Sequence, residues 1–226
     1  MNVDLNNFIY TASHDLKAPI SNIEGLLLAL LDELTPGTAQ SPAIQPLPGL
    51  MQKSVNRFKQ TIDHFSDVSK LQKEHGQPTE PMDLAAVVRD VCLDLDPLIQ
   101  STGARVAVAV AAAPTVYFSE KNLRSVVFNL LSNALKYRDP NRELQVRLHS
   151  RPEGEGVVLV VQDNGLGLDA ANEHRLFGVF QRFHGHVEGT GIGLYMVKKM
   201  VDNAGGRITV QSEVGAGTTF SVYFLR

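Results

Sequence analysis

The sequence predicts an α-helical hairpin over residues 1–76, followed by an α/β sandwich over residues 77–226. In the first part, apolar residues recur at three- and four-residue intervals, which is typical of amphipathic helices. In the second part, helical patterns alternate with short strand-like runs, which indicates a mixed α/β domain. The polar stretch Gly76–Pro81 separates the two parts and has the composition of an interdomain linker.

Two amphipathic helices are expected in the hairpin. The first apolar series runs from Phe8 to Leu34, and the second runs from Leu50 to Leu71. The proline-containing stretch Thr35–Pro48 connects them. A lone hairpin of this length cannot bury both apolar stripes, so we expect two copies to pair as a homodimeric four-helix bundle. The alternative is that the stripes pack against the C-terminal part of the same chain.

The second part contains several expected elements. Asp83 and Ser119 precede two helical patterns as N-cap residues, and Gly205 and Gly206 end a third. The expected helices are Leu84–Gln100, Glu120–Tyr137 and Gly193–Asn203. The expected strands are Arg105–Ala111, Leu144–His149, Val157–Gln162, Arg207–Ser212 and Thr218–Leu225.

Composition excludes several classes of protein. The net charge of −3, with both signs interspersed, argues against a nucleic-acid partner. The single cysteine, Cys92, excludes an internal disulfide and fits a reducing, cytoplasmic compartment. No apolar run is long enough to cross a bilayer, so no membrane contact is expected within this sequence. It could still be the soluble part of a longer, membrane-anchored receptor.

A histidine near the start of the first helix is the candidate nucleophile. His14 lies off the apolar stripe, so its ring is expected to face solvent. An imidazole is a good nucleophile near neutral pH because much of it is unprotonated. Asp15 beside it can hydrogen-bond one ring nitrogen and make the other more basic. Taken alone, such a pair is usually an ordinary solvated surface pair.

Two asparagines and a lysine share one face of the helix over Glu120–Tyr137. Asn129, Asn133 and Lys136 form a polar stripe opposite an apolar one. Carboxamide oxygens and an ammonium group suit a Mg²⁺ ion with phosphates. A plain surface stripe is the alternative, although asparagine is a mediocre helix former and two in mid-helix need a reason.

Two glycine-containing segments are the remaining candidates. In the segment from Asp163 to Gly167, glycines permit a tight turn, and the carboxylate can accept a hydrogen bond from an exocyclic amine such as that of adenine. In Gly189–Leu194, successive glycines before a helix let backbone N–H groups converge on an anion. A Rossmann motif is excluded because Leu194 stands where its third glycine would be.

These motifs, in this order and over nearly the whole chain, resemble the sensor histidine kinases of two-component systems. The resemblance implies a dimerisation and phosphoacceptor hairpin followed by a Bergerat-type ATP-binding α/β sandwich. It also implies ATP and Mg²⁺ as ligands and the receiver domain of a response regulator as partner. The segments that resemble the family's boxes are Phe8–Ile23, Asn129–Tyr137, Asp163–Gly167, Leu176–Phe183, Gly189–Leu194 and Gly215–Phe220.

The resemblance also implies a role for individual residues. His14 would be the phosphoacceptor, with Asp15 as its base or orienting acid. Asn133 would bind Mg²⁺ with Asn129 close to the metal and the phosphates. The other residues would bind ATP: Lys136 and Arg182 at the phosphates, Tyr137 and Thr218 along the nucleotide, Asp163 at the adenine amine, and Gly165, Gly167, Gly189, Gly191, Gly193 and Leu194 in the loops.

Single positions distinguish this sequence from related proteins with other functions. ATP-hydrolysing proteins with the same sandwich place a glutamate where Asn129 stands, so hydrolysis would lack its general base here. A catalytically silent ATP-binding dimeric scaffold is the second alternative. Ala18, one helical turn after His14, replaces the polar residue of family members that dephosphorylate their regulator, which implies weak phosphatase activity.

Overall fold

The computed structural model describes residues 20–21, 23–28, 48–56, 58–59, 62, 79–178, 181 and 191–225. The chain divides into two compact units, Met1–Lys73 and Glu74–Arg226. The division into functional domains at residue 76 stays a prediction of the sequence.

The described residues of the N-terminal unit are helical, in two stretches within residues 20–28 and 48–62. Glu24 on the first stretch forms an ion pair with Lys59 on the second. Its carboxylate also accepts a hydrogen bond from Gln52 Nε2 at 3.0 Å. The two helical stretches therefore contact each other, as a hairpin requires. The dimeric four-helix bundle stays a prediction.

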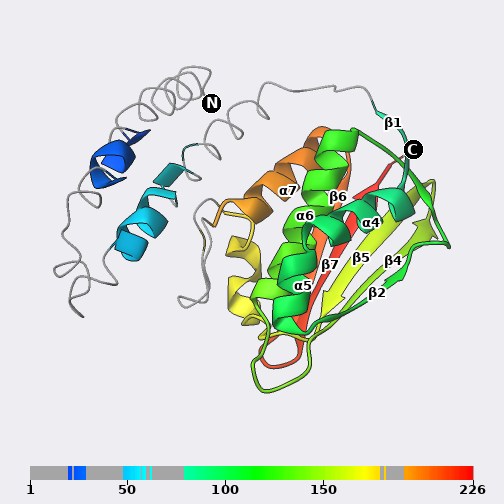
Figure 1. Cartoon of the computed structure of the whole chain (residues 1–226). Coiled ribbons are helices and arrows are strands. Elements are labelled where there is room, and N and C mark those ends of the chain that lie inside the picture. The colour runs from blue at the N-terminus through cyan, green and yellow to red at the C-terminus, as the bar shows by residue number, and fades with distance from the viewer. Residues whose placement is uncertain are drawn as a thin grey trace. The chain divides into compact units, whose positions relative to one another are not determined.

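A five-stranded sheet forms one layer of the C-terminal unit (Figure 1). The strand order is β2-β4-β5-β7-β6, with β2 and β4 parallel and all other neighbours antiparallel. The strands are β2 (Arg105–Ala109), β4 (Gln145–Glu153), β5 (Gly156–Asp163), β6 (Arg207–Glu213) and β7 (Gly217–Phe224).

Four helices form the second layer on a single face of this sheet (Figure 1). They are α4 (Leu84–Asp94), α5 (Asp96–Thr102), α6 (Glu120–Lys136) and α7 (Gly193–Asn203), and a short 3₁₀ helix, η1 (Ala170–Arg175), precedes α7. The core lies between the layers, where the fully buried side chains include Leu123, Leu130, Leu131, Leu135, Leu148 and Leu159. The expected α/β sandwich is thus observed.

A separate two-stranded sheet was not expected from the sequence. Strand β1 (Glu80–Asp83) pairs antiparallel with β3 (Thr115–Phe118). Phe118 packs edge-on against Phe224 of β7, with ring centroids 5.0 Å apart. Glu80 and Pro81 therefore belong to a strand and not to the predicted linker. Its partner strand lies more than thirty residues later in the sequence, so no local pattern indicated the pairing.

The helix expected over Leu84–Gln100 is two helices. The first ends at Asp94, and Leu95 (φ −93°, ψ 3°) leaves the helical conformation before α5 begins. Pro97 explains the break, because proline lacks the N–H of a helix interior and is favoured in a first turn. Asp83 caps the first helix as expected, accepting from the Ala85 N–H at 2.8 Å. Ser119 occupies the N-cap position of α6 but makes no side-chain capping bond.

Ser150 joins strand β4 to the segment that follows β2. Its buried hydroxyl lies 2.7 Å from the Val110 carbonyl oxygen and 2.9 Å from the Ala113 carbonyl oxygen. We expect Ser150→Ala to lower the free energy of unfolding by about 2 kcal/mol, because it leaves a buried carbonyl oxygen without its donor and the Ala113 N–H without its acceptor. Urea denaturation followed by circular dichroism measures the effect. Ser101→Ala, which removes an exposed hydroxyl bond, is the matched control and should change stability little; equal losses would contradict the prediction.

Candidate functional site

The polar stripe of α6 forms the first side of the candidate site. Asn129 and Asn133 are half-buried and Lys136 is exposed. The opposite face of the helix is buried and includes Leu130, Leu131, Ala134 and Leu135. The division of this helix into a polar and an apolar face is therefore confirmed.

Asn129 connects α6 to the start of α7. Its Nδ2 group donates to the Ser125 carbonyl oxygen at 2.8 Å, which turns the Oδ1 atom away from its own helix. A Cβ atom added to Gly193 would lie only 2.4 Å from that Oδ1 atom. Glycine at position 193 thus leaves room for the Asn129 carboxamide at the start of α7. Ser125 was not among the predicted site residues, although its position four residues before Asn129 was a possible signal.

The second glycine motif therefore lies beside the polar stripe. Gly191 has φ +71°, a left-handed conformation that glycine adopts without strain. Gly193 is the first residue of α7, and Leu194 follows half-buried in its first turn. The N–H groups of a first helical turn have no partner within the helix and attract anions. The arrangement places this positive helix end next to Asn129.

Asp163 ends strand β5 and is the most perturbed acid of the site. Its Oδ1 atom accepts from the Gly165 N–H at 2.8 Å and from the Thr218 N–H at 3.2 Å. Burial raises the pKa of its carboxyl group to about 6, although these two bonds and the Arg142 guanidinium lower it. A carboxylate that is costly to ionise in the free protein is typical of a functional site, where a ligand that donates a hydrogen bond relieves the cost.

The loop after β5 is held against the end of α6. The Leu166 N–H donates to the Tyr137 carbonyl oxygen at 2.8 Å. A Cβ atom added to Gly165 would lie 2.4 Å from that same carbonyl oxygen, so only glycine fits. Arg142 donates to the Gly165 carbonyl oxygen at 3.1 Å and was not predicted, because no motif surrounds it. Asp163 is thereby brought to the C-terminal end of the polar stripe.

The same loop packs against the turn between β6 and β7. The Ser212 hydroxyl lies 2.8 Å from the Thr218 hydroxyl and accepts from the Leu168 N–H at 2.9 Å. Gly217 lies so close to β5 that a Cβ atom there would be 2.1 Å from the Asp163 carbonyl oxygen. Ser212 is another residue that sequence reasoning missed. Together these contacts fix Thr218 beside Asp163.

The structure places six of the predicted nucleotide residues in contact as three pairs. Asn129 lies against Gly193, Tyr137 against Gly165, and Asp163 against Thr218. Four predicted site residues lie outside the described residues: His14, Asp15, Arg182 and Gly189. Their roles stay predictions.

The donor set fits a Mg²⁺ ion that arrives with a nucleotide. Asn129 presents an amide oxygen away from its helix, and Asn133 follows one turn later. Mg²⁺ prefers oxygen ligands and is usually held by one or two protein groups together with phosphates and waters. Within the described residues, no group of three or more histidine, cysteine, aspartate or glutamate side chains could hold a metal ion alone.

Comparison with known proteins identifies this arrangement. Residues 118–226 match the family described as histidine kinase-, DNA gyrase B-, and HSP90-like ATPase. The methanogenesis regulatory histidine kinase FilI of Methanothrix harundinacea is 28% identical over 217 residues, covering 96% of this chain and 24% of that protein. The chain carries a sensor histidine kinase catalytic domain. The phosphate regulon sensor protein PhoR of Pseudomonas aeruginosa is 29% identical over 224 residues, covering 96% of this chain and 49% of PhoR.

Solved structures agree with the fold of this histidine kinase domain. Full-length ShkA in complex with AMPPNP has a TM-score of 0.76 at 23% identity, covering 96% of this chain and 45% of ShkA. The mycobacterial sensor histidine kinase MprB has a TM-score of 0.55 at 26% identity, covering 64% of this chain and 97% of that structure. The chain spans less than half the length of FilI, PhoR and ShkA. In the part of the chain that the structure describes, no helix is long and apolar enough to cross a membrane.

Proposed function

We propose that this chain is an ATP-dependent protein histidine kinase that phosphorylates His14 and passes the phosphoryl group to an aspartate of a response regulator. The observation that supports this most is the position of Asp163. The carboxyl group is half-buried where the loop after β5 meets the β6–β7 turn, and only its Oδ1 atom accepts the two backbone hydrogen bonds. Its Oδ2 atom is the natural acceptor for the exocyclic amine of adenine.

The phosphate end of ATP would lie along α6 and at the start of α7. Lys136 would neutralise phosphate charge, and the first N–H groups of α7 would bind phosphate oxygens. Asn129 and Asn133 would hold Mg²⁺, which supplies further charge neutralisation when bound. Phosphoryl transfer depends mainly on such positioning and charge stabilisation. Arg182 and Gly189 would complete the phosphate contacts.

In the transfer step, a ring nitrogen of neutral His14 attacks the γ-phosphorus. A phosphorus–nitrogen bond forms while the bond between the γ-phosphorus and the bridging oxygen breaks, and ADP leaves. Asp15 would hold the proton on the other ring nitrogen and accept it as the ring becomes positive. Because an asparagine stands at position 129, no general base activates water at that position, which favours transfer over hydrolysis.

The N-terminal unit supports a homodimer. In the described stretches, the exposed large apolar side chains are Ile23, Leu26, Leu28, Leu50, Met51 and Phe58. Ile20, Leu27 and Ile62 are buried within the single chain. An apolar surface that one hairpin leaves exposed would be covered by a second copy in a four-helix bundle. The response-regulator receiver domain would dock on the hairpin near His14.

Substitution of the phosphoacceptor tests the proposal directly. With γ-labelled ATP and Mg²⁺, the parent chain should acquire acid-labile, base-stable label. We expect His14→Gln to lower the label at least about 1000-fold, because no nucleophile remains at that position. His174→Gln is the control and should label normally. Label that persists on His14→Gln would contradict the role of His14, and ATP binding without label on either protein would favour the scaffold alternative.

A further inference from the structure

The face of the sheet that points away from the helices carries a row of cations. On β4, Arg147, His149 and Arg151 alternate with the buried residues Val146, Leu148 and Ser150, so they project to the open face. The strand register then places Arg151 opposite Val158, Val158 opposite Tyr223, and Tyr223 opposite Arg207. A line of arginine, valine, tyrosine and arginine thus crosses four strands.

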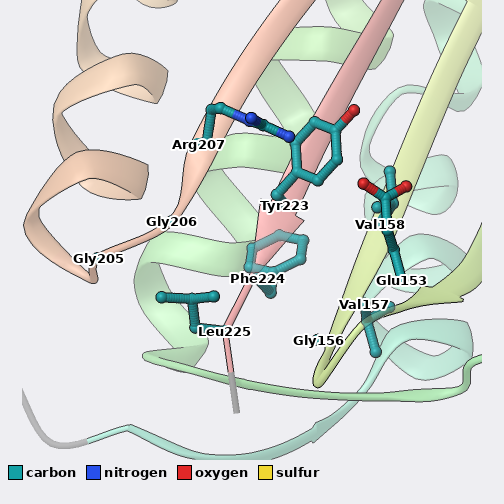
Figure 2. A pocket seen from close by; sticks show the side chains of 10 residues that line it. All are labelled: Glu153, Gly156, Val157, Val158, Gly205, Gly206, Arg207, Tyr223, Phe224 and Leu225. Atoms are coloured by element: carbon teal, nitrogen blue, oxygen red, sulfur yellow. The ribbon is translucent and has the colours of Figure 1, made fainter.

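Two of these arginines lack an acidic partner. Among the described residues, neither Arg147 nor Arg207 forms an ion pair, and Arg151 pairs only with Glu153 at 2.9 Å on the surface. The Arg207 guanidinium lies 4.1 Å from the centre of the Tyr223 ring (Figure 2). Stacking fixes the orientation of the guanidinium plane and leaves its edge N–H groups available for a carboxylate.

A hollow of about 300 Å³ lies at the end of this row (Figure 2). It is formed where β4 ends, β5 begins, β7 ends and β6 begins, and Tyr223 and Leu225 give it apolar walls over the buried Val158. Glu153, the ion-pair partner of Arg151, also lines it. Gly156 and Gly206 contribute no side chains, and a Cβ atom at either would lie within 2.4 Å of a β7 carbonyl oxygen. The hollow can therefore accept an apolar side chain beside the Arg207 guanidinium.

His149 lies between the arginines of β4 with its Nδ1 atom buried and without a hydrogen-bond partner. Burial, and then the Arg147 and Arg151 guanidinium groups, lower the pKa of its imidazole. Its register neighbours on β2 and β5, Ala109 and Val160, carry no charge. The ring thus has two cations beside it on its own strand and uncharged register neighbours on the adjoining strands.

We propose that this open face and hollow form a docking site for an acidic segment of a partner protein. Carboxylates of the segment would bind Arg147, Arg151 and Arg207, and one apolar side chain would enter the hollow. Charge complementarity supports this occupant, because Arg147, Arg151 and Arg207 outnumber the one carboxylate beside them, Glu153, although the chain as a whole is acidic. A single-stranded nucleic acid is less suited, since Tyr223, the aromatic side chain of the row, already has a guanidinium over its ring.

The docking site is separate from the nucleotide site. The hollow lies at the Gly156 end of β5, whereas Asp163 ends the same eight-residue strand. The hollow is thus about 25 Å from Asp163 at the rise of a β-strand. Arg147 lies closer, opposite Gln162, but it projects to the open face, whereas Asp163 is opposite Val146, which is buried on the helix-covered face. A partner docked on the open face would therefore leave the nucleotide site accessible, and the proposal does not depend on phosphorylation of His14.

A peptide titration of the full chain tests the docking site. The probe is a fluorescent twelve-residue peptide with a central leucine flanked by glutamates, and its glutamine counterpart is the comparison. We expect Arg147→Glu and Arg207→Glu each to weaken binding about tenfold or more. Arg89→Glu, on an exposed face of α4, is the matched control and should leave binding unchanged. In nuclear magnetic resonance spectra, the peptide should raise the pKa of His149.

Several outcomes would overturn the proposal. They are equal binding of the glutamine peptide, equal weakening by Arg89→Glu, absence of saturable binding up to millimolar peptide, and tighter binding of a single-stranded RNA oligonucleotide to the same residues. Binding of an ATP analogue by every variant confirms that each is folded. If the parent chain labels His14 normally but does not bind the peptide, this proposal fails and the kinase proposal stands. If it binds the peptide but does not label, the reverse holds.

Discussion

Replacing Asp163 by asparagine is expected to lower the affinity for ATP about 100-fold while the fold is kept. The amide oxygen of asparagine can still accept from the Gly165 and Thr218 N–H groups, as Oδ1 does in the parent. The second atom changes from an oxygen that accepts to an amino group that donates. That atom can no longer bind the adenine amine, but it can donate to the exocyclic carbonyl oxygen that inosine triphosphate carries in place of the amine.

Isothermal titration calorimetry with ATP and inosine triphosphate measures this change. The parent should prefer ATP, and the asparagine variant should lose or reverse that preference. Asp90→Asn, an exposed change on α4, is the control and should bind both nucleotides as the parent does. An equal loss of affinity for both nucleotides would show that Asp163 supports the loop and does not recognise the base.

The same substitution should change how stability depends on pH. The pKa of Asp163 in the folded protein is raised to about 6 from the ordinary 3.8, so the folded state binds the proton more tightly than the unfolded state. The stability of the free parent therefore falls as pH rises from about 4 to about 6, by roughly 2–3 kcal/mol. Asparagine carries no such proton, so above pH 6 the free variant should be at least as stable as the free parent.

Nucleotide affinity should show the opposite dependence on pH. Because the ionised Asp163 carboxylate accepts the adenine amine, ATP affinity of the parent should fall as pH drops below about 6. The asparagine variant serves as the control, because it retains every effect of protonation of the nucleotide itself. The difference between the two proteins isolates the contribution of Asp163.

The elements that the sequence predicted best are those whose predictive features lie within the element itself. The polar and apolar faces of α6 followed from the spacing of Asn129, Asn133 and the leucines between them, and the observed helix differs by one residue at its end. Helix α7 has the predicted bounds because glycines begin it and Gly205, with φ +75°, follows its end. Periodicity and glycine positions are properties of a short stretch of chain, so a single sequence is enough to predict the bounds of such a helix.

The features that the sequence did not predict depend on contacts between distant residues. Strand β1 contains a proline and becomes a strand only because β3 pairs with it. The bond from the Thr218 N–H to Asp163 joins residues 55 positions apart. Arg142 binds the Gly165 carbonyl from a loop without any motif. The motifs indicated the residues of the candidate site, but the contacts that order them arise from tertiary structure.

Replacing Gly167 by alanine is expected to destabilise the C-terminal unit by about 3–5 kcal/mol. Gly167 has φ +67°, where a side chain costs about 1–2 kcal/mol. Its Cβ atom would also lie 1.8 Å from the Glu213 carbonyl oxygen and 3.1 Å from that of Gly217. Both obstacles are backbone atoms, so no side chain can rotate away. The loop must separate from the β6–β7 turn and break the bond from the Gly215 N–H to the Leu166 carbonyl oxygen.

Gly215→Ala is the matched control for this prediction. Gly215 lies in the adjoining turn with φ +78°, and nothing lies within 4 Å of an added Cβ atom. The two substitutions therefore share the cost of a left-handed residue and differ only in the backbone overlap. Hydrogen exchange of β5 and β7 amides, read by mass spectrometry with and without an ATP analogue, measures both stability and nucleotide binding. Similar exchange in the two variants would contradict the prediction. It would show that the backbone overlap at Gly167 is relieved without loss of stability, and that the loop does not need its close contact with the β6–β7 turn.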